Sequence, residues 1–195
     1  MQSLFSRQRS LDFLSLRDKI ISYALPILLV GITLVARVFH IIPNFSPVGA
    51  IALFAGTMMV GVSRWVALIG LVISDIVMAS IGTYGLSFWA YLAGSPAVYV
   101  AFGLTTIMGM ANKHKKSLVT AINVLTSAVV FFVVTNLACW PAYGLTYAGL
   151  VTDFTAAIPF FRSTLESNVI YSSLLFGALW VATQLVRRGP VSWAR

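Results

Sequence analysis

Few side chains in this 195-residue chain could do chemistry, and two of them stand where a charge is costly. Arg37 closes one long apolar stretch, and Asp75 lies past the middle of another. A charged residue at membrane depth costs about 2.5–3.5 kcal/mol on insertion scales, so it usually faces a partner or a polar cavity. Two interpretations stay open: an Arg37–Asp75 ion pair that joins two helices, or contact with a bound polar ligand.

Other polar and aromatic candidates stand at the ends of apolar stretches. Asn136 could hydrogen-bond to another helix or recognise the amide and carbonyl groups of a ligand. Cys139, the single cysteine, carries a soft sulfur of the kind that binds cobalt or copper, but a cysteine in an apolar setting is also an ordinary packing residue. The remaining candidates for ligand contact are Asn44, Trp89, Trp140, Phe160 and Arg162.

No known catalytic pattern is present. The sequence contains no HExxH, no GxSxG and no glycine-rich phosphate loop, and no pair of carboxylates is spaced to share a helix face. His40 and His114 do not stand at metal-ligand spacing. We therefore predict that the chain is not an enzyme and holds no cofactor.

The composition is that of a membrane protein. Hydrophobic residues make up 59% of the chain and charged residues only 9%, whereas soluble domains carry about 25% charged residues. The net charge is +8, but the basic residues flank apolar stretches and form no single stripe. This pattern argues against nucleic-acid binding and indicates that the chain lies in a lipid bilayer.

The apolar stretches predict an all-α integral membrane protein with a compact bundle of six transmembrane helices. The expected helices cover residues 20–39, 48–62, 65–81, 87–110, 118–139 and 168–186. Residues 1–19 and 188–195 are then tails, and 20–187 form the transmembrane domain. With the N-terminus inside, only Arg37 and Arg162 of the thirteen Lys and Arg residues fall outside. This positive-inside bias predicts that both termini are cytoplasmic.

Two further features bear on function. Residues 140–167 form the longest predicted connection, and we expect an outer loop there that orders as a lid over a ligand. Pairs of small residues four positions apart let helices approach closely, either inside the bundle or against a partner subunit. These pairs are Ala52 with Gly56, Ala90 with Gly94, and Ala97 with Ala101.

Four sequence motifs resemble those of a bacterial family of small transport proteins without an assigned substrate. They are PNFSPVGAIALFAG at Pro43–Gly56, SD at Ser74–Asp75, TNLACW at Thr135–Trp140 and IPFFRST at Ile158–Thr164. That family is similar to the substrate-binding S-components of energy-coupling-factor (ECF) vitamin transporters. The resemblance spans about residues 37–177.

The resemblance implies six helices and an outward-opening ligand site covered by loops. It places the motif residues near that site: Asn44, Asp75, Asn136, Trp140, Phe160 and Arg162. S-components dock on an energising ECF module through small residues of the first helix, often Ala-xxx-Ala. Here Gly31 and Ala36 lack that spacing, which favours a transporter that works alone. Solitary relatives take up cobalamin, and Cys139 would then be a cobalt ligand of the corrinoid.

We therefore expect a transport protein of the bacterial inner membrane that binds a small solute, such as the vitamin cobalamin, at its outer face for uptake. Arg37, Asp75, Asn136 and Arg162 would hold the polar groups of the solute. Trp89, Trp140 and Phe160 would pack against its apolar surface. The alternative is a membrane structural or assembly protein that transports nothing and binds a protein partner through its outer loops.

Overall fold

A computed structural model describes residues 23–39, 42–82, 85, 87–94, 96–112 and 114–188. Every regular element in these ranges is a helix, so the all-α prediction is confirmed. The elements are α2 (Leu25–Val38), α3 (Val48–Met58), η2 (Gly61–Trp65), α4 (Val66–Ser80), α5 (Phe88–Ala93), α6 (Pro96–Ala111), α7 (Ser117–Cys139), η4 (Trp140–Tyr143), α8 (Tyr147–Ala156) and α9 (Ile158–Arg188). The predicted tail 1–19 and all but the first residue of the predicted tail 188–195 lie outside the described residues.

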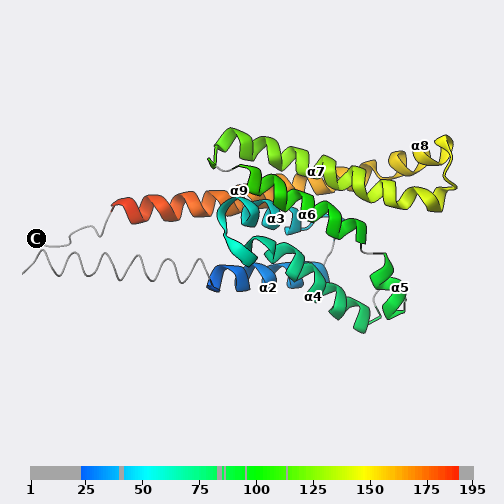
Figure 1. Cartoon of the computed structure of the whole chain (residues 1–195), viewed down its shortest axis with the longest axis horizontal. Coiled ribbons are helices and arrows are strands. Elements are labelled where there is room, and N and C mark those ends of the chain that lie inside the picture. The colour runs from blue at the N-terminus through cyan, green and yellow to red at the C-terminus, as the bar shows by residue number, and fades with distance from the viewer. Residues whose placement is uncertain are drawn as a thin grey trace, which may run out of the picture.

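Three stretches of helix are long and apolar enough to cross a membrane. They cover Gly61–Ser80, Ser117–Tyr143 and Ile158–Leu185, and each reaches the length that a bilayer core of about 30 Å requires. Shorter apolar helices, α2, α3 and α6, run alongside them (Figure 1). Only a small part of the α7 and α9 spans is buried inside the chain, so their apolar side chains remain available to lipid.

The centre of the bundle is α3, in which every residue except Met58 is buried. It packs against α6, α9, α4 and α7. Glycine allows the closest of these approaches, because a Cβ added to Gly56 would lie 2.2 Å from the carbonyl oxygen of Thr106. A Cβ on Gly109 would likewise lie 2.6 Å from the carbonyl oxygen of Leu53. The predicted role of Gly56 in close helix packing is therefore confirmed.

One predicted helix is in fact two. The stretch 87–110 forms α5 and α6, and α6 begins at Pro96. Proline fits the first turn of a helix, but it disfavours a helical conformation in the residue before it. The apolar composition of the stretch hid this break.

The predicted outer loop at 140–167 is wrong, because most of it is helical. After η4 the chain turns at Gly144, whose φ is 86°, and Thr146 then caps α8 by accepting a hydrogen bond from the Gly149 N–H at 3.0 Å. The helix expected from residue 168 already begins at Ile158. Its first turns are polar on one face, which is why the sequence resembled a loop there.

The two ends of the bundle differ. Helices α5 and α8 lie at one end in Figure 1, and the α3–α4 and α6–α7 connections lie at the other with the last turns of α9. Arg64, Lys115 and Lys116 belong to those connections. We call the first the α8 end and the second the basic end.

Candidate ligand-binding site

A cavity of about 240 Å³ lies at the α8 end of the bundle. Its walls come from the segment before α3, from α6 and α7, and from the junction of α8 and α9. The lining residues are Asn44, Val98, Phe131, Phe132, Thr135, Asn136, Cys139, Ala157, Phe160, Phe161 and Thr164. The cavity thus brings together four predicted residues: Asn44, Asn136, Cys139 and Phe160.

Aromatic rings form the apolar part of the cavity wall. Phe132 packs on Phe161 with ring centroids 5.0 Å apart, and on Phe154 of α8 at 5.3 Å. Phe131 packs on Phe102 of α6 at 5.0 Å. Because such ring pairs hold one another in place, the wall is a fixed apolar surface suited to a flat or aliphatic group.

The polar atoms that face the cavity are mainly acceptors. Asn136 is only 8% exposed; its Nδ2 donates to the carbonyl oxygen of Phe132 at 2.6 Å, and its Oδ1 accepts no hydrogen bond from a described residue. The hydroxyl groups of Thr135 and Thr164 donate to backbone carbonyls at 2.8 and 3.0 Å, which leaves their oxygen lone pairs as acceptors. A ligand with N–H or O–H donors would satisfy these atoms.

No charged side chain is among the described residues that line the cavity. A buried ionic group needs a partner of opposite charge, so this lining favours an uncharged ligand. We predicted that Arg37, Asp75 and Arg162 hold the polar groups of the ligand, but none of these charged residues lines the cavity.

The charged residues Arg37 and Asp75 pair with each other, as one of the two interpretations anticipated. Asp75 of α4 is 1% exposed and forms an ion pair with Arg37 of α2. Tyr99 of α6 donates its hydroxyl hydrogen to Asp75 Oδ2 at 2.5 Å. Tyr99 follows the cavity residue Val98, and successive residues on a helix point about 100° apart. This triad joins three helices next to the cavity without lining it.

The other predicted site residues also lie elsewhere. Trp89 of α5 is 77% exposed. Trp140 donates its Nε1–H to the carbonyl oxygen of Thr146 at 2.9 Å and thereby closes the turn before α8. Arg162 donates to Glu166 Oε1 at 2.8 Å on an exposed face of α9. None of these three side chains lines the cavity.

Cys139 is exposed where it lines the cavity. Within the described ranges, no group of three or more His, Cys, Asp or Glu side chains could hold a metal ion. If a cobalt-containing solute bound there, the cysteine sulfur would be the one soft ligand that this lining supplies.

Sequence reasoning missed several cavity residues. Phe131 and Phe132 stand in the apolar run VVFFVV, where nothing in the sequence separates a lipid-facing ring from a cavity-facing one. Phe161 stands beside the predicted Phe160, and a second ring in the same motif was the available signal.

Asp153 falls within the predicted loop 140–167, but it is a buried residue of α8. Its Oδ2 has no hydrogen-bond partner in the described structure.

The chain is an all-helical membrane protein by its three long apolar helices, and it holds a small cavity at the α8 end. It belongs to a family of unknown function, DUF6580, whose profile matches residues 17–190. No curated protein and no solved structure matches the chain.

Proposed function

We propose that this protein is a transport protein of the bacterial inner membrane that binds a small uncharged solute in the α8-end cavity for uptake. The observation that supports the proposal is the lining itself, in which four phenylalanine residues and the buried side chain of Asn136 line one cavity. Ligand sites are mostly apolar with a few placed polar groups, and this cavity has that character. The resemblance to ECF S-components supports the same function.

The size of the cavity narrows the class of solute. Its volume of about 240 Å³ lies below the ~300–1,000 Å³ of sites for drug-sized ligands. We infer a solute with few heavy atoms, one apolar face and at least one N–H or O–H donor. Cobalamin would enter only if α7 and α9 moved apart, with Cys139 as its cobalt ligand.

We also propose that the chain crosses the membrane six times with both termini in the cytoplasm. Helices α2, α3 and α6 have 14, 11 and 16 residues, fewer than the ~20 that a lipid-exposed span needs. The burial of α3 supports its place among the six, since a helix surrounded by protein need not match the bilayer. A reporter fused after Arg195 tests the orientation, and activity on the outer side would contradict it.

The first experiment is to purify the protein from its host membrane and identify co-purifying small molecules by absorbance and mass spectrometry. A bound corrinoid would absorb visible light, whereas the small solute that we favour would appear only in the mass spectrum. The same preparation tests how uptake is energised. We propose a transporter that works alone, and a co-purifying energising ECF module would contradict this.

Asn136→Leu tests the site once a solute is identified. It removes the acceptor oxygen, and a ligand donor left unpaired costs about 1–3 kcal/mol, or roughly 5- to 150-fold in affinity. Asn123→Leu is the matched control, because Asn123 also lies on α7 and donates to a backbone carbonyl, that of Met108, without lining the cavity. Equal affinities of the two variants in detergent would remove the cavity from the proposal.

The rival function, a structural or assembly protein, has an observation of its own. Trp89 and Tyr147 are strongly exposed large aromatic side chains in α5 and α8, at the same end as the cavity. Exposed aromatic residues are frequent in protein interfaces. Recovery of a stoichiometric protein partner, lost on Trp89→Ser and Tyr147→Ser and accompanied by no small molecule, would favour this function.

A further inference from the structure

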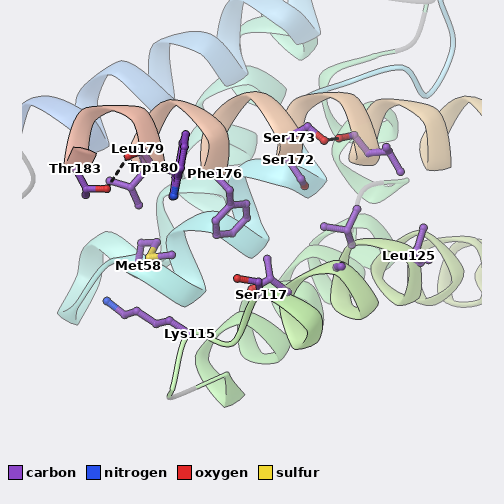
Figure 2. A pocket seen from close by; sticks show the side chains of 14 residues that line it. Met58, Lys115, Ser117, Leu125, Ser172, Ser173, Phe176, Leu179, Trp180 and Thr183 are labelled. Carbon is purple, nitrogen blue, oxygen red and sulfur yellow. Dashed lines mark hydrogen bonds between the residues drawn. The ribbon is translucent and has the colours of Figure 1, made fainter. Parts of the chain in front are cut away.

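A second and larger hollow lies at the basic end of the bundle, between α7 and α9 (Figure 2). We call it the α7–α9 groove. It has a volume of about 540 Å³ and shares no lining residue with the cavity at the α8 end. Its lining residues are Met58, Lys115, Ser117, Thr120, Ala121, Val124, Leu125, Val169, Ser172, Ser173, Phe176, Leu179, Trp180 and Thr183.

The groove is long and mostly apolar. The α9 residues that line it run from Val169 to Thr183, which at 1.5 Å per residue is about 21 Å. One leaflet of a bilayer core is about 15 Å deep, half of the ~30 Å total. Phe176 lines the groove, as do Leu125 and Trp180, whose side chains are exposed. The groove therefore has the length and surface to hold one extended acyl chain.

Lys115 places a positive charge at one end of the groove, near Met58 in Figure 2. A hydrogen-bonded turn holds this position: the Lys116 N–H donates to Asn112 Oδ1 at 3.0 Å, and Asn112 Nδ2 donates to Thr120 Oγ1 at 2.9 Å. The φ of Lys115 is 50°, in the left-handed region that favours glycine. A non-glycine residue in this conformation strains the backbone. That Lys stands here and not Gly indicates that the Lys115 side chain has a function.

No carboxylate balances this charge within the described structure of the groove. Asp75, Asp153 and Glu166 are the described acidic residues, and none of them lines the groove. The lining around Lys115 consists of hydroxyl and apolar side chains. An occupant with a negative group at this end would neutralise the ammonium, and an occupant without one would leave it unmatched.

Ser172 lies in the half of the groove that is farther from Lys115. This residue is 4% exposed, and its Oγ has no hydrogen-bond partner in the described part of the chain. Figure 2 shows its side chain directed from α9 toward α7, whereas the neighbouring Ser173 hydroxyl donates to the carbonyl oxygen of Val169.

We propose that the α7–α9 groove binds one acyl chain of an anionic phospholipid, with the phosphate at Lys115. The long apolar surface of the groove would hold the acyl chain, and the ammonium group of Lys115 would bind the negatively charged headgroup. Basic pockets between transmembrane helices bind anionic lipid headgroups in this way. A zwitterionic phospholipid also carries a phosphate, but the cation of its headgroup cancels the net negative charge. Inorganic phosphate carries the charge but has no acyl chain.

The test uses Trp180, which lines the groove, as a reporter. Trp65, Trp89, Trp140 and Trp193 are replaced by Phe, and the full chain is reconstituted in phosphatidylcholine vesicles. Brominated phosphatidylglycerol and brominated phosphatidylcholine are then titrated separately while quenching of Trp180 fluorescence is recorded. We expect phosphatidylglycerol to quench at about fivefold lower mole fraction, the factor that corresponds to about 1 kcal/mol per basic residue near a membrane surface.

Two variants and one control distinguish recognition of the lipid headgroup from recognition of the acyl chain. Lys115→Gln should abolish the preference for phosphatidylglycerol, and Lys116→Gln, an exposed neighbour outside the groove lining, should retain it. Ser172→Leu shortens the groove and should weaken quenching by both lipids. Equal quenching by the two lipids in the parent protein, or equal preference in the two lysine variants, would overturn the proposal. So would loss of the preference in millimolar inorganic phosphate, which would make Lys115 a simple anion site.

Discussion

Replacing Asp75 by Asn separates a structural role of the Arg37–Asp75–Tyr99 triad from a role in ligand binding. Asp75 is almost fully buried and its carboxylate pairs with Arg37, so the substitution removes the negative member of this ion pair. Breaking a buried pair by removing one member costs about 3–5 kcal/mol. For a chain of this size, 1 kcal/mol corresponds to about 2–4 °C in Tm, so we expect Tm to fall by roughly 6–20 °C.

The assay is far-UV circular dichroism during heating of the purified protein in mild detergent, with size-exclusion chromatography to confirm a monodisperse sample. Glu166→Gln is the matched control, because it removes the carboxylate of the exposed Arg162–Glu166 pair on α9. Exposed pairs contribute little, so the control should leave Tm unchanged. Tyr99→Phe removes one hydrogen bond to a charged acceptor and should lower Tm by less than Asp75→Asn.

The outcome also decides between the two interpretations of these charges. Asp75→Asn should leave the affinity for an identified solute unchanged at temperatures below its own transition, because Asp75 does not line the cavity. If Asp75→Asn and Glu166→Gln shifted Tm equally, the buried ion pair would not stabilise the bundle. If Asp75→Asn abolished solute binding without lowering Tm, the ligand would contact the triad and our placement of the site would be wrong.

Two further predictions concern stability and use the same thermal assay. Gly56→Ala should destabilise the bundle by about 1–3 kcal/mol, because its Cβ would overlap the Thr106 carbonyl. Gly31→Ala is the control: its Cβ has open space, so this substitution should be neutral or slightly stabilising. Equal shifts in Tm for the two variants would contradict the close α3–α6 contact. Asn112→Ala should lower stability by about 1–3 kcal/mol because it removes the side-chain bonds to Lys116 and Thr120, and an unchanged Tm would mean that these bonds do not hold the turn.

The sequence predicted the helices that are uniform along their length. The α7 boundaries were expected at 118 and 139 and are 117 and 139, because an unbroken apolar run follows the basic segment at 113–116. The start of α9 was missed because the segment before residue 168 contains polar residues such as Arg162 and Glu166 and resembles a loop. In the helix, Arg162 and Glu166 pair on the exposed face, and Asn168 is buried and donates to Ser127 Oγ at 3.0 Å. Composition does not reveal which face a polar residue occupies.

The site was predicted only in part for a related reason. Asn44, Asn136 and Phe160 stood out because polar or motif residues at helix ends are informative in a membrane protein. The rings of Phe131 and Phe132 did not, because their role depends on how α7 is rotated against α6 and α9. Arg37 and Asp75 were noticed for their charge, but their charges satisfy each other. That compensation is visible only when α2 and α4 are placed side by side.

Helix α9 has 31 residues and is about 46 Å long, so it reaches from one end of the bundle to the other. Its first turns line the cavity at Phe160 and Thr164, and its later turns line the groove from Val169 onward. The cavity and the groove therefore share one continuous helix in their walls. If a lipid in the groove tilts α9 and changes solute affinity, linkage requires the solute to change lipid affinity by the same factor. The lipid composition of the host membrane would then set the sensitivity of uptake.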